Sequence, residues 1–340
     1  MAIRVLTVDD SILFRTVIKT EFAKIDDIDI IDTAANAAEA EEKIMRLNPD
    51  VVTMDVEMPG MNGIDFIRSF IPKKRVPFIV ITSSPTRAFD AISAGAVEFM
   101  KKPLVHNSAE MSSFANKLAS TIRFSAKANV HTMPVRPIAT PAAINLPTSG
   151  GRANTVIALG ASTGGTEALI EVVKRLPANS PPVVIVQHMP PGFTQMYAER
   201  LDKICAMSAK EAQDGDRLRP GLIIVGAGGY QMRLCKDARG YFISSKPGPK
   251  VSGHCPSVDV LFESVSEVAG NRAVGAILTG MGADGAEGLL KMRKRGAYTI
   301  GQDEATCVVY GMPGVAFKLG AVMKQLPLDR IADEIIAKVK

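Results

Sequence analysis

The sequence lacks the marks of several protein classes. Cysteine is rare and no two cysteines form a Cys-x-x-Cys pair, the four being Cys205, Cys235, Cys255 and Cys307. This spacing argues against a zinc site and a disulfide scaffold, and it favours a reducing compartment. No stretch approaches the roughly 20 apolar residues of a membrane helix. The first residues enter a strand-like pattern directly, so we expect no signal peptide, a cytoplasmic protein and no membrane insertion.

Charge of one sign is scarce as well. The 340 residues include 40 Lys and Arg against 35 Asp and Glu, for a net charge of +5. Nucleic-acid-binding proteins usually gather basic residues into a stripe, and since the sequence has no such run we expect no nucleic-acid partner. The balance changes along the chain, because residues 1–105 carry 13 basic and 16 acidic side chains whereas residues 106–152 carry 5 and 1. The segment with the basic excess is a candidate boundary between domains.

The middle of the chain separates two candidate domains. A helix-like pattern, with apolar residues at spacings of three and four, extends to Ile122. The segment after it is rich in proline and small residues and has no apolar period, which is typical of a linker. We place a flexible linker at residues 125–153, an N-terminal domain at 1–124 and a C-terminal domain at 154–340. A chain of this length can bury a sizeable core in each.

Both flanks of the linker predict α/β domains. Apolar runs of strand length alternate with segments of helix length, which favours parallel sheets with right-handed crossovers. In the N-terminal domain the expected strands lie at residues 5–8, 28–31, 51–54, 78–81 and 97–100. In the C-terminal domain they lie at residues 155–159, 183–186, 222–225, 273–278 and 298–300. Residues 241–256 lack a helical period, and we expect a hairpin there.

Polar side chains follow four of the N-terminal strands. In chain order they are Asp9 with Asp10, Asp55, Ser83 and Lys102. Because the carboxyl ends of parallel strands lie along one sheet edge, these groups should converge. Clustered carboxylates need a cation such as Mg²⁺, beside which an aspartate can attack a phosphoryl donor while Lys102 and Ser83 hold the phosphoryl oxygens. Any one of these aspartates is most simply a polar strand end, but the set favours a phosphorylation site.

Four blocks within residues 1–125 carry a resemblance to a known family. VDDS, MDVEMPGMNG, ITSS and KKP are similar to the signatures of two-component receiver domains. The resemblance implies a flavodoxin-like fold with a five-stranded parallel sheet, phosphorylation at Asp55 and Mg²⁺ as the cofactor. It further implies Mg²⁺ ligands at Asp10, Asp55 and the Glu57 carbonyl with Asp9 acting through water, a phosphate-binding Lys102, a switch pair of Ser83 and Phe99, and a cis Lys102–Pro103 bond.

The C-terminal domain opens with a strand that runs into a Gly-rich turn. Residues 160–164 read Gly-Ala-Ser-Thr-Gly and fit G-x-S-x-G, in which the glycines permit a sharp turn that presents a serine, here Ser162. His188 and Asp284 also follow strands, so the three side chains can meet at one sheet edge. This set favours acyl transfer, in which His188 takes the Ser162 proton, Asp284 holds the imidazole, and backbone N–H groups bind the oxyanion.

Other interpretations of this domain fit less well. The order Ser…His…Asp differs from the Ser…Asp…His order of α/β-hydrolases. His254 is a second candidate base, but its segment resembles a pocket wall or a helix start rather than a strand end. A dinucleotide site would need the G-x-G-x-x-G spacing and an acidic residue after the second strand, and both are missing. In the favoured interpretation Met281 supplies an oxyanion N–H and Thr163 lines the nucleophile.

Six blocks within residues 154–323 resemble the catalytic domain of the chemotaxis response-regulator methylesterases, the CheB family. They are ALGASTGGTEAL, IVQHMPPGFT, DGDRLRPGLIIV, PSVDVLF, ILTGMGADGAEGLL and GQDEATCVVYGMP. The resemblance implies a doubly wound, mostly parallel α/β domain with no cofactor in the esterase site. It implies protein-glutamate methylesterase and protein-glutamine deamidase activity on methyl-accepting chemoreceptors, with Ser162, His188 and Asp284 as the triad and a chemotaxis histidine kinase as phosphodonor. Departures from the family pattern at Cys255, Ala227 and Gln231 leave the choice of substrate open.

The fusion of the two domains predicts that one controls the other. We expect the unphosphorylated receiver to block the site near Ser162, and phosphorylation of Asp55 to relieve the block. Two alternatives remain open: an adaptor whose second domain is inactive, and a regulated hydrolase of a related non-chemotaxis chemosensory system. Methanol release from methylated receptors separates all three.

Overall fold

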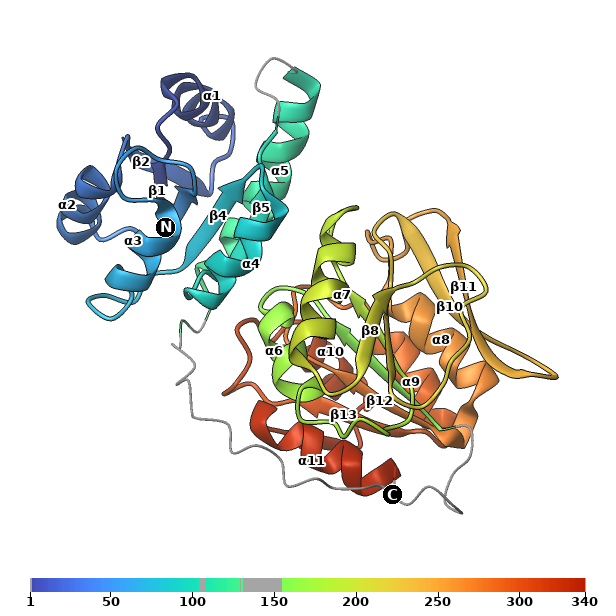
Figure 1. Cartoon of the computed structure of the whole chain (residues 1–340). Helices are drawn as coiled ribbons and strands as arrows, with labels where there is room; N and C mark the ends of the chain where they lie inside the picture. Colours follow the sequence, from blue (N-terminus) through green and yellow to red (C-terminus); the bar gives the residue numbers. More distant parts are fainter. Residues whose placement is uncertain (1, 104–107, 129, 131–154, 340) are drawn as a thin grey trace. The chain divides into compact units, whose positions relative to one another are not determined.

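The computed structural model describes residues 2–103, 108–128, 130 and 155–339 (Figure 1). The chain divides into two compact units, Met1–Pro134 and Val135–Lys340, and each is described by itself. The last helix of the first unit ends at Ser125. Most of the predicted linker at 125–153 lies outside the described residues, so its boundaries stay a prediction. Within the described part of the chain, no helix is both long enough and apolar enough to cross a membrane.

The N-terminal unit contains a five-stranded sheet of order β2-β1-β3-β4-β5, in which every pair of neighbours is parallel. Its strands are β1 (Ile3–Val8), β2 (Ile28–Ala34), β3 (Val51–Asp55), β4 (Phe78–Thr82) and β5 (Glu98–Lys101). Its helices are α1 (Ile12–Phe22), α2 (Ala37–Leu47), α3 (Gly63–Phe70), α4 (Pro85–Ser93) and α5 (Ser108–Ser125). The five predicted strands are confirmed, and their order is that of flavodoxin-like folds.

Capping residues and apolar spacing explain where these helices begin and what they cover. The side chains of Ser11 and Asn62 accept first-turn N–H groups and so begin α1 and α3. On α1, Phe14, Ile18 and Phe22 recur every four residues and are buried in a core shared with α5 and the sheet. The loop after β1, which carries predicted site residues, is thereby fixed between a buried strand and a capped, packed helix.

The C-terminal unit contains a seven-stranded sheet of order β14-β13-β12-β6-β7-β9-β8, with all neighbours parallel. Its strands are β6 (Val156–Ala161), β7 (Val183–Gln187), β8 (Ser208–Glu211), β9 (Leu222–Val225), β12 (Ala273–Ile277), β13 (Tyr298–Gln302) and β14 (Lys324–Leu326). Its helices are α6 (Gly165–Val173), α7 (Phe193–Ile204), α8 (Val258–Val268), the 3₁₀ turn η1 (Gly270–Arg272), α9 (Ala286–Lys294), α10 (Met312–Lys318) and α11 (Leu328–Val339). The five predicted strands are confirmed, and the prediction missed the short edge strands β8 and β14.

Apolar residues on both faces of this sheet bury it between helices. Val156 and Ala158 on β6 face a core that contains residues of α8 and α9. Side chains alternate along a strand, so Ile157 and Leu159, which are also fully buried, point to the opposite face. The helices α6 and α11 pack against each other, and each also contacts a strand of the sheet. Burial on both faces is what a doubly wound parallel sheet requires.

An antiparallel hairpin packs beside this sheet. It consists of β10 (Tyr230–Asp237) and β11 (Gly240–Pro247). The hairpin predicted within residues 241–256 therefore begins earlier in the chain, because β10 precedes that segment. Met232 and Leu234 on β10 alternate inward and pack against α8, which ties the hairpin to the core.

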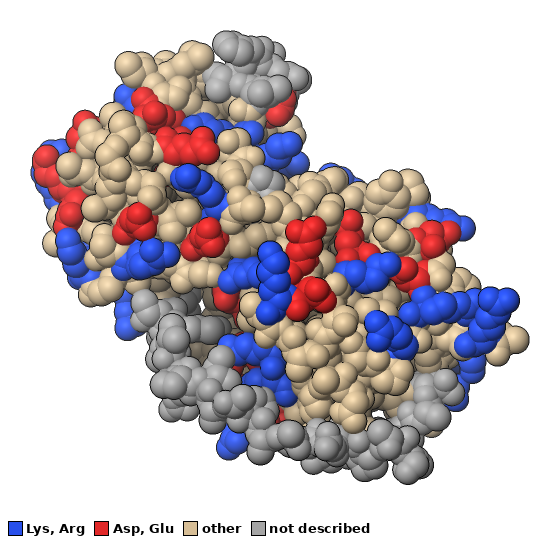
Figure 2. Space-filling view, in the orientation of Figure 1, with Lys and Arg blue, Asp and Glu red and all other residues tan. Residues whose placement is uncertain are grey.

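Charged side chains on the described surface are mixed in sign. On the face drawn in Figure 2, Lys and Arg side chains are interspersed with Asp and Glu. Several form exposed ion pairs, such as Arg123 with Asp27 at 2.7 Å and Arg175 with Asp333 at 2.9 Å. Exposed pairs of this kind contribute about 1 kcal/mol or less each. The folded state of each unit is therefore stabilised mainly by its own packed core.

Candidate functional sites

The N-terminal sheet brings three predicted site residues into contact at its carboxyl edge. Asp9 follows β1, Asp55 is the last residue of β3 and Lys102 follows β5. The Lys102 ammonium lies 2.7 Å from Asp9 Oδ2 and 2.5 Å from Asp55 Oδ2. Ligand oxygens of Asp9, Asp10 and Asp55 all lie within 4.8 Å of one another. The predicted convergence of these side chains is therefore present.

One lysine does not neutralise this group of carboxylates. Burial, and then the nearby charge of Asp55, raise the pKa of Asp9 to about 6 even though Lys102 acts in the opposite direction. Burial alone would lower the pKa of Lys102, but Asp55 and Asp9 outweigh it and the pKa is raised. Three clustered carboxylates with one ammonium are a donor set that suits a hard divalent cation such as Mg²⁺. The Glu57 N–H donates to Asp55 Oδ1 at 3.1 Å, which places the Glu57 backbone beside the same carboxylate.

The two predicted switch residues have different surroundings. Ser83 is exposed just after β4, whereas Phe99 is buried and packs edge to face on Phe89 of α4, with ring centroids 5.8 Å apart. Sequence reasoning missed Thr82, the fully buried last residue of β4, whose carbonyl accepts the Lys102 N–H at 3.0 Å. Its place at the strand end was the available signal.

The predicted cis bond between Lys102 and Pro103 is wrong. Both residues are described, and the cis peptide bond that the structure has among the described residues is Cys255–Pro256. The Lys102 N–H donates to the Thr82 carbonyl at 3.0 Å, which continues the pairing of β5 with β4 by one residue.

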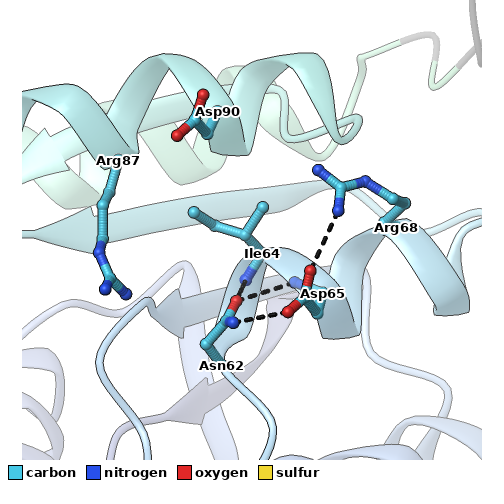
Figure 3. Close-up of a pocket in the computed structure, with 6 residues that line it drawn as sticks. All are labelled: Asn62, Ile64, Asp65, Arg68, Arg87 and Asp90. Atoms are coloured by element: carbon cyan, nitrogen blue, oxygen red, sulfur yellow. Dashed lines mark hydrogen bonds and ion pairs between the residues drawn. The ribbon is translucent and has the colours of Figure 1, made fainter.

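A shallow pocket lies elsewhere on the N-terminal unit, between α3 and α4 (Figure 3). Asp65 pairs with Arg68 at 3.0 Å on one side, and Arg87 and Asp90 of α4 line the other. Positive and negative groups are matched in number, and the predicted site residues are not among those that line it. The pocket therefore offers no concentration of one charge.

In the C-terminal unit, three adjacent central strands carry the predicted triad. Ser162 follows β6 and His188 follows β7, and these strands pair in register with Ala161 opposite Gln187. The His188 N–H donates to the Ala161 carbonyl at 3.3 Å, so the backbones of Ser162 and His188 lie side by side. Asp284 lies in the loop after β12, the neighbour of β6 on its other side. The sheet thus brings all three to one edge.

The Asp284 carboxylate is buried, and four donors satisfy it. His188 Nε2 and the Val258 N–H each lie 2.7 Å from Oδ2, while the Ser257 hydroxyl at 2.7 Å and the Asp259 N–H at 3.0 Å reach Oδ1. Ser257 is also the N-cap of α8, so the carboxylate faces the positive end of a helix. Burial, the largest influence, raises the pKa of Asp284, but the hydrogen bonds from His188 and Ser257 outweigh it and lower the pKa to about 2.

The contact with Asp284 decides which His188 nitrogen is available. Nε2 is the atom bound to the carboxylate, so it carries the proton, and Nδ1 is the basic nitrogen. Nδ1 is buried and has no hydrogen-bond partner in the described structure. The imidazole is therefore oriented at Nε2 alone, and the Ser162 hydroxyl does not lie within hydrogen-bond distance of Nδ1 in the described structure.

The loop after β12 closes over Ser162. The Ser162 N–H donates to the Thr279 carbonyl at 3.0 Å, and Thr279 Oγ1 donates to the carbonyl of the buried Thr163 at 3.0 Å. A Cβ at Gly280 would lie only 2.8 Å from Ser162 Cβ, so a glycine is required there. The next residue is Met281, whose backbone N–H makes no hydrogen bond that the structure records within its described residues. This N–H is available to a developing oxyanion.

Sequence reasoning missed several residues that hold this site. The Gln187 amide donates to the Ser162 carbonyl at 2.8 Å, and the Gln302 carbonyl oxygen accepts the Thr279 N–H at 2.8 Å. Both glutamines are the last residues of buried strands, so a strand-end amide was the available signal. The role of Ser257 had no such signal, because it depends on how the segment before α8 folds back.

Comparisons with known proteins point to the same two regions. A family model described as CheB methylesterase matches residues 157–335, and one described as response regulator receiver domain matches residues 5–111. The chain is 47% identical to protein-glutamate methylesterase/protein-glutamine glutaminase 2 of Syntrophomonas wolfei, covering 98% of this chain and 96% of that protein. It is 41% identical to protein-glutamate methylesterase/protein-glutamine glutaminase of Salmonella typhimurium, covering 99% and 97%. Among solved structures, the Thermotoga maritima CheB methylesterase catalytic domain matches with a TM-score of 0.53 and 35% identity, covering 54% of this chain and 98% of that one.

Proposed function

Because this chain belongs to the CheB methylesterase family, and is by that membership a protein-glutamate methylesterase and protein-glutamine glutaminase, we propose that its reaction proceeds through Ser162, His188 and Asp284 under control of phosphorylation at Asp55. The observation that supports the proposal is the 2.7 Å contact of His188 Nε2 with Asp284, made by a histidine that follows the strand next to the one that ends before Ser162. The substrates are glutamate methyl esters and glutamine side chains of methyl-accepting chemoreceptors, and the reaction takes place in the cytoplasm.

The first half of the reaction forms an acyl-enzyme. His188 Nδ1 removes the proton from Ser162 Oγ as Oγ attacks the side-chain carbonyl carbon of the substrate. The imidazolium that results is stabilised by the ionised Asp284, which already accepts a hydrogen bond from Nε2. The Met281 N–H donates to the carbonyl oxygen as it becomes negative. The intermediate then collapses, and the Nδ1 proton goes to the leaving group, which departs as methanol or ammonia.

The second half of the reaction releases the receptor. Water loses a proton to His188 Nδ1 and attacks the same carbonyl carbon, and the Ser162 Oγ bond breaks as the proton returns to Oγ. Ester and amide substrates give the same glutamyl-serine intermediate, so one site serves both activities. No step requires a cofactor in this site.

Control resides at the edge of the receiver sheet. Asp10, Asp55 and the Glu57 carbonyl would hold Mg²⁺, with Asp9 acting through water, and the donor oxygens gathered there fit that ion. The bound ion would neutralise phosphoryl oxygens. Asp55 Oδ attacks the phosphorus of the phosphohistidine donor of a chemotaxis kinase, and the histidine leaves. Lys102 then pairs with the phosphoryl group.

Phosphorylation has to be transmitted from Asp55 to the catalytic domain. Ser83 and Phe99 shift toward the new charge, and the buried contact between Phe99 and Phe89 is the packing that this shift alters. The unphosphorylated receiver restrains the catalytic domain, and the shift relieves that restraint. The fusion of a receiver to a hydrolase is what supports this control.

Methanol release from methylated chemoreceptors tests both parts of the proposal. Full-length protein, its phosphorylated form and a fragment of residues 150–340 are compared, together with Ser162→Ala in each. We expect phosphorylation and removal of the receiver each to raise the rate, and Ser162→Ala to abolish it. Equal rates in the three Ser162 forms would contradict control, and methanol release by Ser162→Ala at the parental rate would contradict the mechanism.

A further inference from the structure

A second histidine lies flat against the base of the triad. The rings of His254 and His188 are stacked with centroids 3.5 Å apart and planes 5° apart. Asp284 therefore holds the edge of the His188 ring, and His254 covers one face. A ring held at its edge alone can still tilt about the hydrogen bond, whereas a ring held at its edge and its face cannot.

The geometry excludes direct proton transfer between the two rings. The lone pair and the N–H of an imidazole lie in the plane of its ring, and in parallel stacked rings neither points at the other. His254 thus does not act as the base for His188. The position instead brings the π-face of one ring against the ring that becomes positively charged during the reaction, an arrangement that attracts a cation.

The backbone around His254 is built to hold it in place. Val251 and His254 exchange two backbone hydrogen bonds of 2.9 Å across a tight turn, in which Ser252 and Gly253 both have positive φ. From β10, the Gln231 amide donates to the His254 carbonyl at 3.1 Å. The backbone that carries the stacked ring is thus held by its own turn and by a neighbouring strand.

The charge state of His254 suits a stacking role. Burial, followed by the proximity of His188, lowers the pKa of His254 to about 4. The ring is therefore neutral at neutral pH and adds no repulsion when His188 becomes an imidazolium. A second cation at this position would oppose the proton transfer on which the reaction depends.

We propose that His254 is a positioning residue that fixes the tilt of the His188 ring by stacking and so holds Nδ1 in one position for proton transfer from Ser162. This inference rests on the proposed function and assigns a role to a residue outside the triad. The part of His254 that matters is its flat aromatic face rather than its ring nitrogens. Phenylalanine should therefore replace it, while leucine, of similar bulk but not flat, should not.

The kinetic test compares His254→Phe and His254→Leu with the parent, all as full-length phosphorylated protein acting on methylated chemoreceptors. Misplacing a reacting group by about 1 Å can cost about a hundredfold in rate, so for His254→Leu we expect kcat to fall about tenfold to a hundredfold. We expect KM to change less than about twofold, and His254→Phe to stay within about threefold of the parent in kcat. Equal losses in both variants, no loss in His254→Leu, or a change confined to KM would each overturn the proposal.

A spectroscopic test does not depend on turnover. ¹⁵N NMR of the imidazoles in the full chain reports which His188 nitrogen carries the proton. We expect the Nε2–H form in all three proteins, because Asp284 sets it, with slow solvent exchange of the Nε2 proton in the parent and in His254→Phe and faster exchange in His254→Leu, whose ring can tilt out of that hydrogen bond. Equal exchange in the parent and in His254→Leu, or an Nδ1–H form in the parent, would overturn the proposal. If the parent releases no methanol the proposed function fails, and the NMR result still decides whether the stack orients His188.

Discussion

A buried aspartate lies at the carboxyl edge of each parallel sheet, and the surroundings of the two carboxylates shift their pKa values in opposite directions. At the edge of the receiver sheet, burial and Asp55 raise the pKa of Asp9 to about 6, although Lys102 is only 2.7 Å away. At the edge of the catalytic sheet, four hydrogen bonds outweigh burial and lower the pKa of Asp284 to about 2. The interactions of Asp9 do not offset the cost of burying its charge, whereas the hydrogen bonds of Asp284 do.

The difference fits what each site has to do in the proposed function. A catalytic base needs a fixed orientation at every turnover, and a permanently ionised, fully bonded Asp284 supplies it to His188. A switch needs a site whose charge is balanced only when something is added. The excess negative charge beside Asp55 keeps the receiver edge ready for a cation and a phosphoryl group. Under this proposal, the carboxyl edge of a parallel sheet provides a rigid site in one unit and a responsive site in the other.

Asp284→Asn should have the largest effect on the catalytic unit. Asparagine has one acceptor oxygen, so its NH₂ group must face donors from α8 or from His188, and the imidazole loses its imposed tautomer. We expect kcat for methanol release to fall about 10⁴-fold, the loss found when the acid of a serine triad becomes an amide. As the control, Asp202→Asn removes an exposed carboxylate that accepts the Ala209 N–H at 2.8 Å, and it should leave kcat unchanged.

Asp55→Asn should remove the response of the receiver while leaving the basal reaction intact. The variant keeps the triad but cannot form the aspartyl phosphate, so a phosphodonor with Mg²⁺ should raise the methanol release of the parent and have no effect on the variant. Chelation of Mg²⁺ should give the parent the same unresponsive behaviour. Asp50→Asn, an exposed strand-end change in the same unit, is the control and should respond like the parent. A response that survives in Asp55→Asn would place the phosphoryl group elsewhere.

Gln231→Ala should loosen the support of the catalytic edge by a smaller amount. Gln231 Nε2 donates to the carbonyls of Pro249 and His254, and its Oε1 accepts the Ser257 N–H at 2.9 Å. Loss of these bonds should lower kcat about tenfold or less, since the segment is still held by its own turn. Gln195→Ala on the surface of α7 is the matched control and should have no effect. An unchanged kcat in Gln231→Ala would show that this anchor is dispensable.

Asp9→Asn should stabilise the receiver without bound metal. The pKa of Asp9 is raised in the folded state, so the folded state binds the proton more tightly and stability is lost as pH rises from about 4 through about 6. Neutral asparagine avoids this loss, which we expect to be on the order of 3 kcal/mol at pH 7.5. The effect should disappear below about pH 4.

The two units can be followed separately in this experiment. All five tyrosines lie in the C-terminal unit and the chain has no tryptophan, so tyrosine fluorescence reports the unfolding of that unit alone. Amide hydrogen exchange in β1 and β3 reports the receiver. Asp27→Asn is the control, because the pKa of Asp27 is lowered by its bond to Arg123 and its removal should not slow exchange. Faster exchange in Asp9→Asn at pH 7.5 would contradict the account of this edge.

The sequence was sufficient to predict where the reacting groups lie, because parallel strands place their ends together. Asp9, Asp55 and Lys102 meet as expected, and Ser162, His188 and Asp284 lie at the ends of adjacent strands. The short edge strands β8 and β14 escaped prediction because their residues are only partly buried and show no apolar run.

The contacts that surround the reacting groups could not be predicted from the sequence pattern. The stack of His254 on His188 depends on a tight turn and on a side chain from β10, which no local spacing reveals. The donors from the start of α8 to Asp284 come from about 26 residues away in the chain and meet it only through the packing of α8 against α9. Such contacts depend on tertiary packing, and only the folded chain shows them.

The most direct test of the central claim is the rate of methanol release from methylated chemoreceptors by the full-length protein, before and after phosphorylation, with Ser162 intact or replaced by alanine. The account predicts that the intact chain is active and becomes faster on phosphorylation, and that Ser162→Ala releases no methanol in either state while keeping its fold. Methanol release by Ser162→Ala at the parental rate, or an intact chain that is indifferent to phosphorylation, would contradict it.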